Sequence, residues 1–408
     1  MDQMVEHALS FSDSEVKPIP YYCMEGICYL NNAAAAPLSP SVISAGWKAM
    51  QQPPWAMESD DDQEAVRRLF SQLIAADEDC VATMPSTAFA ITLAAENIKR
   101  TAIRPGKILV LQDQMCSAVY GFQNICDTTE GFTLEIVPYP SSDGGWTQSV
   151  LENLSDDIVV ACVPPLHWSD GAIIDLDAVG VSCRQKGIVL IVDATQAVGI
   201  MPINVGTIKP ALLACSIHKW LRGPVGMCLV YVEKDLHQKW LPLDQHGRSR
   251  DHHGSGSAWD ASKDEMGPGG YSADYLQGAR KFDSGGKPNP LLLPMLRASL
   301  TSVINIDVAQ VQIDLQHLMQ PLLDWAEGKG WLLTPGQHVS HLIGLRPKNI
   351  ATKQMVDICV GLQDDGVYIA VRCGAFRISP YVDTTTADIE RLIAGFECHM
   401  KNEGIPDR

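Results

Sequence analysis

The chain has 408 residues, of which 46% are hydrophobic and 19% charged, and its formal net charge is −17. This is the composition of a globular protein with substantial cores, and it excludes a disordered, collagen-like or coiled-coil chain. The acidic balance argues against a partner that exposes a phosphate backbone, so we expect no nucleic acid.

No apolar run reaches the roughly 18 residues that a membrane span requires, so we expect no membrane partner. The polar, acidic start of the chain lacks the basic and apolar regions of a signal peptide. We therefore expect a cytoplasmic protein. The 12 cysteines form no CxxC pair and no zinc-type spacing, which predicts reduced and mostly buried thiols.

Residues 1–30 are expected to form an N-terminal arm. From about residue 40 to 270, within a large domain predicted over residues 31–280, helical stretches alternate with short β-branched runs such as GIVLIVDA. This alternation predicts an α/β domain with a mostly parallel sheet and helices on both faces. Within it, residues 244–272 are rich in Gly, Ser and His, and they are either disordered or an active-site lid. Helices with a few strands predict a smaller α+β domain over 281–408.

The most informative segment is CSIHKWLRGPVGMCLVYV, which contains Lys219. This lysine follows a predicted strand, and Ser216 and His218 precede it. A lysine at that place can reach the crevice at the carboxyl end of the strand and form a Schiff base with an aldehyde cofactor. The alternative is an ordinary surface lysine in a loop.

A second segment, GIVLIVDATQAVG, places Asp193 at the end of an apolar run. A carboxylate at the end of a buried strand needs a cationic partner, and the protonated pyridine nitrogen of pyridoxal phosphate is such a partner. Gln196, one turn further on, could donate a hydrogen bond to the phenolic oxygen of that cofactor. The alternative is an aspartate that caps the next helix.

Three further segments contribute weaker signals. Ser86 and Thr87 open a predicted helix, where hydroxyl and free N–H groups can bind an anion, although both are also ordinary capping residues. Gly285 and Gly286 suit a tight loop. Arg377 lies in an apolar strand, where a guanidinium needs a carboxylate partner.

Five motifs occur in a fixed order: Asn31-Asn32-Ala33-Ala34-Ala35-Ala36-Pro37, Pro85-Ser86-Thr87, Asp193-Ala194-Thr195-Gln196, Ser216-Ile217-His218-Lys219 and Arg377-Ile378-Ser379-Pro380. Over about residues 20 to 395, the chain therefore resembles the class V aminotransferase family of enzymes that use pyridoxal 5'-phosphate. That family includes cysteine desulfurases, selenocysteine lyases, isopenicillin N epimerase-like proteins and the C–S lyase of ergothioneine biosynthesis.

The resemblance implies a fold-type I homodimer with shared active sites, a cofactor bound in the large domain and an amino-acid substrate. It implies that Lys219 holds the cofactor aldehyde, Asp193 the pyridine nitrogen and Gln196 the phenolic oxygen. It implies that the phosphate is bound by Ser86, Thr87, Ser216 and His218, and that Gly285 and Gly286 of a neighbouring subunit close the phosphate site. It also implies that the substrate is bound by Asn32, His167 and Arg377, of which Arg377 binds the α-carboxylate.

Some residues leave alternatives open. His167 and Trp168 occupy a position where members of the resembled family contact cofactor or substrate, but a packed core pair fits the sequence equally well. Met115 aligns with the position of the residue that faces the cofactor ring. The histidines of the lid stretch, His246, His252 and His253, have no periodic scaffold, so we expect no metal there. 

Desulfurases of the resembled family carry a persulfide-forming cysteine on a mobile loop well before the carboxylate-binding arginine. Here Cys373 precedes Arg377 by only four residues, which leaves no room for that loop. We expect Cys373 to be a strand residue and the enzyme to form no protein persulfide.

The motifs predict an enzyme that acts at Cα or Cβ of an amino acid. Similarity to the C–S lyase branch, strongest in RISPYVDTTTADIERL, favours β-elimination across a C–S bond of a cysteine-derived substrate. An epimerase, an aminotransferase or a decarboxylating deaminase is the alternative. A non-catalytic relative of the same fold is the second alternative, and loss of the lysine or the aspartate would be its signature.

Overall fold

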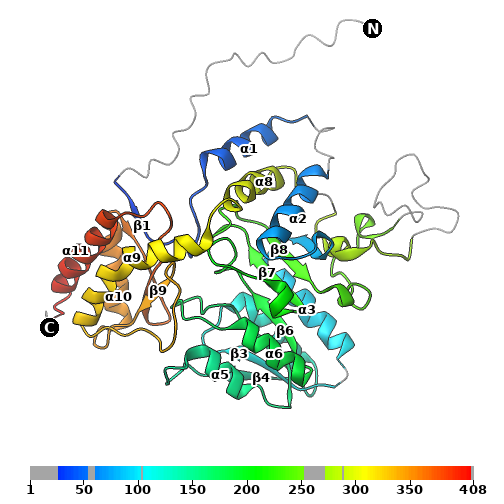
Figure 1. Cartoon of the computed structure of the whole chain (residues 1–408), viewed down its shortest axis with the longest axis horizontal. Helices are drawn as coiled ribbons and strands as arrows, with labels where there is room; N and C mark the ends of the chain where they lie inside the picture. Colours follow the sequence, from blue (N-terminus) through cyan, green and yellow to red (C-terminus); the bar gives the residue numbers. More distant parts are fainter. Residues whose placement is uncertain (1–25, 54–59, 103, 252–271, 287–288, 406–408) are drawn as a thin grey trace, which may run out of the picture.

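The computed structural model describes residues 26–53, 60–102, 104–251, 272–286 and 289–405. Figure 1 shows a large body around a central sheet and a smaller body at its left, which holds the C-terminal helices. Most of the predicted lid stretch, including His252 and His253, lies outside the described residues.

The central sheet has seven strands in the order β2-β8-β7-β6-β5-β3-β4. All neighbouring pairs are parallel except those of β8, which runs antiparallel to β7 and to β2. The predicted mostly parallel α/β sheet is thereby confirmed. The strands are β2 (Val81–Met84), β3 (Lys107–Leu111), β4 (Thr133–Val137), β5 (Ile158–Cys162), β6 (Val189–Asp193), β7 (Leu212–Ser216) and β8 (Cys228–Val232).

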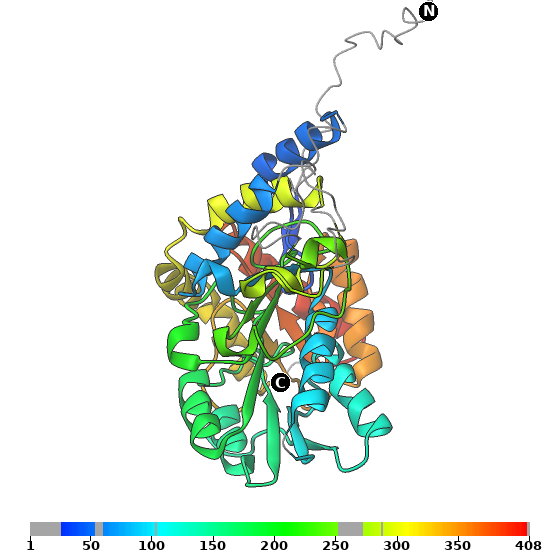
Figure 2. The ribbon, with the colours of Figure 1, turned by 90° about the vertical axis from the view of Figure 1, so that its right-hand side faces the viewer.

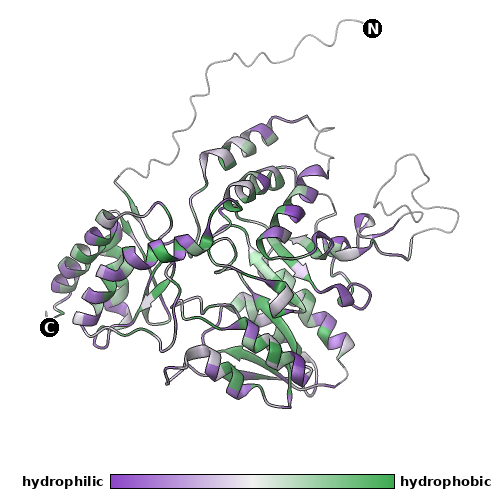
Figure 3. Ribbon diagram, in the orientation of Figure 1, coloured by the Kyte–Doolittle hydropathy of each residue, from purple (hydrophilic) through white to green (hydrophobic). Residues whose placement is uncertain are grey.

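Helices cover both faces of this sheet, as Figure 2 shows from the side. Leu190 and Val192 of β6 belong to one core, and Ile191 between them belongs to the other. A strand that is buried on both faces reads as a continuous apolar run, which explains the green strands of Figure 3. One core includes α2 (Asp61–Leu73), α5 (Gly145–Asn153), α6 (Leu176–Lys186) and α7 (Val205–Ile208), and the other α3 (Thr87–Thr101) and α4 (Tyr120–Thr128).

The smaller body contains an antiparallel sheet in the order β11-β12-β9 and a two-stranded parallel sheet of β1 and β10. A third core joins these strands to three helices. The elements are β1 (Cys28–Tyr29), α9 (Val308–Gly328), β9 (Ile343–Leu345), α10 (Thr352–Asp364), β10 (Val367–Tyr368), β11 (Ala370–Arg372), β12 (Ala375–Ile378) and α11 (Thr386–Asn402).

The three cores show which segments pack together. Cys28 and Leu30 are fully buried in the core of the smaller body. Helix α8 (Leu292–Val303) packs against α1 (Pro40–Met50) and α2, and its apolar side chains join a core of the large body. The domain boundaries at 30/31 and 280/281 stay predictions, since packing alone does not define a domain.

Short 3-10 helices complete the described secondary structure, at Glu78–Cys80, Cys116–Ala118, Lys234–Leu236, Gly247–Ser249 and Gly278–Phe282.

No single helix among the described residues has the length and apolar character of a membrane span. Helices α8 and α9 pass that test only as a pair, with a bend of 75° between them.

Candidate active site

Six of the predicted residues meet in one cavity of about 140 Å³ at the carboxyl edge of the central sheet. Loops that follow β2, β3, β5, β6 and β7 form its walls, which is where open α/β sheets bind their ligands. The lining residues are Thr87, Gln114, Met115, Ser117, Pro164, Leu166, Trp168, Asp193, Thr195, Gln196, Ser216, His218 and Lys219.

Lys219 lies in this cavity, three residues after the end of β7. Burial lowers the pKa of its ammonium group to about 8, with Asp193 opposing the shift and Arg377 adding to it. A lysine with such a pKa is partly deprotonated near neutral pH, which both a nucleophile and a proton carrier require.

Asp193 ends β6 and is buried beside the same cavity. Burial raises the pKa of its carboxyl group, while the backbone N–H of Thr195, at 3.1 Å from Oδ1, and the charge of Lys219 lower it. A carboxylate that burial destabilises gains most from a cation held against it. The protonated ring nitrogen of pyridoxal phosphate would be such a cation, so this residue fits the predicted cofactor.

The side-chain amide of Gln196 has a fixed orientation. Its Nε2 donates to the carbonyl oxygen of Ala33 at 3.0 Å, and its Oε1 accepts from Nε1 of Trp220 at 2.8 Å. Since an amide nitrogen carries two hydrogens, one donor remains for a ligand in the cavity. The residue therefore offers the cavity a donor, as a hydrogen bond to a phenolic oxygen requires.

Hydroxyl groups gather at the start of α3. Oγ1 of Thr87 lies 2.7 Å from Oγ of Ser216, and Oγ1 of Thr195 accepts from the backbone N–H of Ser216 at 3.1 Å. The first N–H groups of a helix and nearby hydroxyls form a site for an anion such as a phosphate. Ser86 is the exposed N-cap of α3, and its Oγ accepts from the backbone N–H of Phe89.

Arg377 is 2% exposed, and within the described part of the chain it forms no ion pair with a carboxylate. Its Nη1 donates to the carbonyl of Trp168 at 3.3 Å and its Nη2 to Oδ1 of Asn31 at 3.4 Å, while Nε has no partner. Burial and then the charge of Arg372 lower its pKa to about 10. Such a guanidinium is suited to a carboxylate that arrives with a ligand.

The predicted substrate residues His167 and Asn32 do not line the cavity. His167 is fully buried, stacks on Trp146 at 5.0 Å between ring centroids, and has its pKa lowered by burial, while its neighbour Trp168 lines the cavity. Asn32 is buried, and its side-chain amide donates to the carbonyl of Ser379. Its neighbour Asn31, and not Asn32, contacts Arg377.

The glycine pair lies in a loop of its own. Gly285 and Gly286 have φ angles of +91° and +69°, and the backbone N–H of Gly285 donates to Asp244. Gly285 is exposed in the single chain. A left-handed backbone of this kind favours glycine, as the predicted tight loop requires.

The expectation that Cys373 is a strand residue is wrong. Cys373 and Gly374 form the two-residue turn between β11 and β12, with φ angles of +49° and +70°. Tight hairpins need positive φ at both turn positions, and the alternating apolar sequence around the turn hid it. Burial raises the pKa of the Cys373 thiol, which keeps it protonated.

Sequence reasoning missed Thr195, Gln114 and Ser117 as cavity residues. Thr195 lies inside the motif Asp193-Ala194-Thr195-Gln196, so the motif itself was the available signal. Gln114 ties two strand ends together, because its Oε1 accepts from Leu111 at 2.8 Å and its Nε2 donates to Cys162 at 3.0 Å. His246 of the predicted lid contacts the carbonyl of Asp283 through Nε2 at 2.9 Å.

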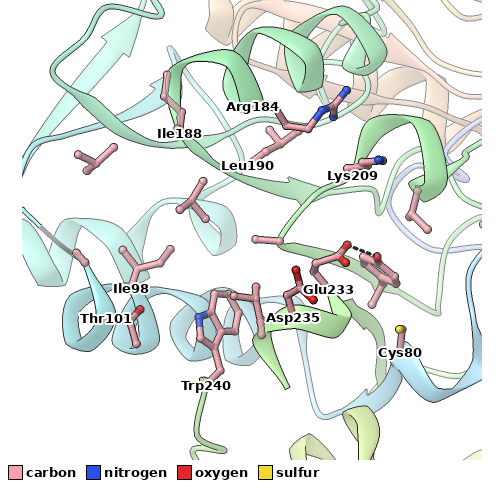
Figure 4. A pocket seen from close by; sticks show the side chains of 18 of the residues that line it. Cys80, Ile98, Thr101, Arg184, Ile188, Leu190, Lys209, Glu233, Asp235 and Trp240 are labelled. Carbon is pink, nitrogen blue, oxygen red and sulfur yellow. Dashed lines mark hydrogen bonds between the residues drawn. The ribbon is translucent and has the colours of Figure 1, made fainter. Parts of the chain in front are cut away.

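A larger cavity of about 940 Å³ lies at the opposite edge of the sheet. Figure 4 shows Arg184 and Lys209 on one side of it, with Glu233 and Asp235 on the other. None of the predicted site residues lines it. The predicted residues therefore gather in the smaller of the two cavities.

Comparisons with known proteins identify the family of the chain. The model of the family "Aminotransferase class-V" matches residues 28–267. An uncharacterized aminotransferase, YcbU of Bacillus subtilis, is 27% identical over 82% of this chain and 83% of its own length. The cysteine desulfurase IscS of Proteus mirabilis is also 27% identical, over 50% of this chain and 53% of its own length.

Solved structures show the same fold. The cysteine desulfurase of Thermococcus onnurineus NA1 superimposes with a TM-score of 0.77 at 16% identity, over 93% of this chain and 96% of that one. The cystine C–S lyase C-DES, bound to its product cysteine persulfide, gives 0.76 at 15% identity, over 92% and 98%. The fold is thus fold type I, as predicted, and the chain belongs to the aminotransferase class-V family of enzymes that use pyridoxal phosphate.

Proposed function

We propose that this protein is a pyridoxal-phosphate-dependent lyase that cleaves the C–S bond of a cysteine-derived amino acid by β-elimination. The observation that carries the proposal is that Lys219 and Asp193 line the same cavity. Next to it, the buried Arg377, which pairs with no carboxylate of the described chain, contacts Trp168 of the cavity wall. In this family the lysine and the aspartate are the two groups that the cofactor requires at its opposite ends.

Each of these residues would hold one part of the cofactor. Lys219 would bind the aldehyde, Asp193 the ring nitrogen and Gln196 the phenolic oxygen, while Thr87, Ser216 and the start of α3 would bind the phosphate. His218 and Ser86 complete the proposed phosphate site, and Met115 lines the wall where the ring would lie. The bound cofactor would supply an electron sink for the charge that develops at Cα.

The substrate would be oriented by Arg377, whose guanidinium matches a carboxylate through two parallel hydrogen bonds. Lys219 would then take the proton from Cα, since its lowered pKa allows it to work as a base near neutral pH. The Cβ–S bond breaks, the sulfur leaves as a thiol after taking up a proton, and water converts the remaining three-carbon fragment into pyruvate and ammonia.

The position of Cys373 supports elimination without a protein persulfide. A two-residue turn between hydrogen-bonded strands cannot carry a thiol into the cavity and out again. The raised pKa of this thiol also disfavours the thiolate that would attack sulfur. A persulfide-forming route would need a different cysteine on a longer loop.

Two measurements test the proposal. Reduction of the purified protein with borohydride, followed by peptide mapping, should place the cofactor on Lys219, and a label on Lys209 or Lys239 would contradict it. S-substituted cysteines should release a thiol, pyruvate and ammonia, and the variant Cys373→Ser should keep this activity. Deuterium uptake at Cα without loss of the side chain would indicate the alternative, an epimerase.

The proposal includes a homodimer, with Gly285 and Gly286 of a second copy near the phosphate end of the cavity. The exposure of Gly285 in the single chain is compatible with such a contact. Light scattering measures the mass of the particle directly. A Gly285→Trp substitution should weaken cofactor retention if a second copy approaches there, and a monomer that keeps the cofactor would contradict the shared site.

A further inference from the structure

The sheet β11-β12-β9 has one face toward the core of the smaller body and the other toward the cavity. Phe376 and Ile378 of β12, and Val371 of β11, pack in that core. Because side chains alternate along a strand, the residues between them share the opposite face. By the strand register these are Gly344, Ala370, Arg372, Ala375 and Arg377.

Contacts identify what this second face meets. Arg377 donates to the carbonyl of Trp168, which lines the cavity, and its guanidinium lies 5.6 Å from the centre of the Trp168 ring. A Cβ atom on Gly344 would lie 2.6 Å from Cα of Asp170 in the same segment. This face of the sheet therefore packs against the wall of the cavity.

Three arginines belong to this side of the sheet, and they differ in whether a carboxylate pairs with their guanidinium group. Arg346, which follows β9, pairs with the buried Asp170 at 3.4 Å. Neither Arg372 nor Arg377 forms an ion pair in the part of the chain that the structure describes, and the one side-chain bond of Arg372 there goes to the carbonyl of Val371. Arg377 is buried without a carboxylate, whereas Arg372 is exposed, so its guanidinium is open to a ligand.

The two arginines are close enough to act on one ligand. Arg372 pairs with Ala375, so Arg377 is its diagonal neighbour on the same face. Diagonal neighbours of an antiparallel pair lie about 7–8 Å apart, within reach of long side chains. The charge of Arg372 also lowers the pKa of both Arg377 and Lys219, which agrees with this proximity.

We propose that Arg372 binds a second anionic group of the substrate, so that the enzyme prefers amino acids whose side chain ends in a carboxylate. The inference rests on the proposed function, because Arg377 must take the α-carboxylate. Two cations on one face repel each other, and a ligand with two carboxylates would relieve that repulsion while a monocarboxylate would relieve half of it. A cysteine whose sulfur carries a carboxyalkyl group combines this feature with the proposed C–S cleavage.

The test uses ligand pairs that differ in charge and hardly in shape. The holoenzyme is titrated with L-glutamate and L-glutamine, and binding is followed through the visible absorbance of the cofactor. We expect glutamate to bind about tenfold more tightly, as for a partly exposed charge-assisted pair. In Arg372→Gln this preference should vanish while the affinity for glutamine stays the same.

The matched control is Arg68→Gln, which removes the same charge from an exposed arginine of α2 and should leave the preference intact. Turnover of S-carboxymethyl-L-cysteine and of its side-chain amide gives a second readout, in which kcat/KM should show the same preference. Equal binding of acid and amide by the wild type, or a preference that survives in Arg372→Gln, would overturn the inference and leave the proposed function standing. If neither S-carboxymethyl-L-cysteine nor its amide nor any other S-substituted cysteine is turned over, the proposed function fails as well.

Discussion

Some charged side chains around the cavity are paired with an opposite charge and others are not, and the unpaired ones are candidates for ligand binding. Asp170 and Arg346 neutralise each other behind the cavity wall. Asp193 and Arg377 have no such partner of opposite charge in contact with them among the described residues, although both are buried. A protein that keeps buried charges without partners pays for it in stability, so such groups usually serve a ligand.

Replacing Asp193 by asparagine keeps the shape and removes the charge. We expect Asp193→Asn to fold and to retain the cofactor weakly, because an amide cannot stabilise a protonated ring nitrogen. Turnover should fall by a factor on the order of 10² or more, and the absorbance spectrum should change. Asp177→Asn, which alters an exposed carboxylate of α6, serves as the control. Unchanged turnover in Asp193→Asn would reduce Asp193 to a turn residue.

The proposed role of Arg377 can be tested with a substitution that keeps the positive charge and changes the geometry of the donors. Arg377→Lys keeps the positive charge but loses the two parallel donors, which should raise KM for amino-acid substrates at least tenfold, equivalent to about 1.5–3 kcal/mol. An amine that lacks the α-carboxylate should bind equally well to wild type and variant. Equal KM values for the amino acid would exclude the proposed role.

At this scale the motifs at strand ends were sufficient to predict the centre of the site. Lys219, Asp193 and Gln196 follow buried strands, so their place at the carboxyl edge follows from the fold. The sequence could not decide between the neighbours His167 and Trp168, because the segment after β5 is irregular and alternation gives no phase there. Only the packing of His167 on Trp146 assigns the two residues to opposite sides.

Secondary-structure elements of the two bodies meet at the floor of the cavity. His341, just before β9, donates from Nε2 to the carbonyl of Gln196 at 2.8 Å, because Nδ1 accepts from Nε2 of Gln312 in α9. The amide of Gln312 is oriented in turn by the N–H of Ser340 and the carbonyl of Ile200. These contacts fix a neutral tautomer of His341 and connect α9 to the residue proposed to face the cofactor.

We expect His341→Leu to change the visible spectrum of the bound cofactor, since the carbonyl of Gln196 loses its donor and Trp220 loses the ring that packs against it at 4.6 Å between centroids. His341→Gln, which restores a donor near the Nε2 position, should recover much of the wild-type spectrum. His237→Leu removes another buried histidine bonded to a backbone carbonyl, at a place away from the cavity, and should leave the spectrum unchanged. A spectrum that stays constant in His341→Leu would show that the contact only contributes stability.

The same histidine predicts a pH dependence of stability. Burial lowers the pKa of His341 to about 4, well below its unfolded value of 6.5, so the unfolded chain binds a proton first as the pH falls. The free energy of unfolding should therefore decline between pH 6.5 and 4, by about 3 kcal/mol at most from this group. Chemical denaturation of wild type and His341→Gln across this range isolates the contribution, and parallel curves would contradict it.

Close backbone contact between β9 and the cavity wall gives a further prediction. A Cβ at Gly344 would lie 2.6 Å from Cα of Asp170 and 2.7 Å from the carbonyl oxygen of Ser169. We expect Gly344→Ala to lower the free energy of unfolding by about 1–3 kcal/mol and to displace Trp168, which quenching of tryptophan fluorescence would report. Gly328→Ala, at the end of α9 with no atom within 4 Å of the added Cβ, should be neutral.

Several elements were not predicted from the sequence, and β2 and α10 show two different reasons. Strand β2 is only four residues long and ends in Thr-Met, too short to stand out from the helix signal that follows. Helix α10 buries Met355, Ile358 and Leu362 at helical spacing, but its polar positions are many and its flanks resemble strands. Strand β6 was predictable because burial on both faces gives a continuous apolar run, and α3 because its buried residues recur at helical spacing.

On the scale of the whole molecule, loops at the carboxyl edge of the central sheet line the cavity, and the smaller body places Arg377 against Trp168 of its wall. The alternation of helices and strands was sufficient to predict this fold class, and family membership confirms it. The antiparallel direction of β8 could not be predicted, because a buried strand has the same composition in either direction. How the two bodies pack against each other could not be predicted either, because this packing depends on contacts between residues far apart in the sequence, such as Arg377 and Trp168.

The pairing of β1 with β10 has a consequence for the synthesis of the protein. Cys28 lies beside Val367, and Leu30 is sealed in a core whose other members begin at Met319. On the ribosome, the segment that contains β1 emerges long before the surface that it joins is made. The large body can thus fold during translation before β1 is paired. A chain that is released before β10 has been made would leave β1 without its partner strand.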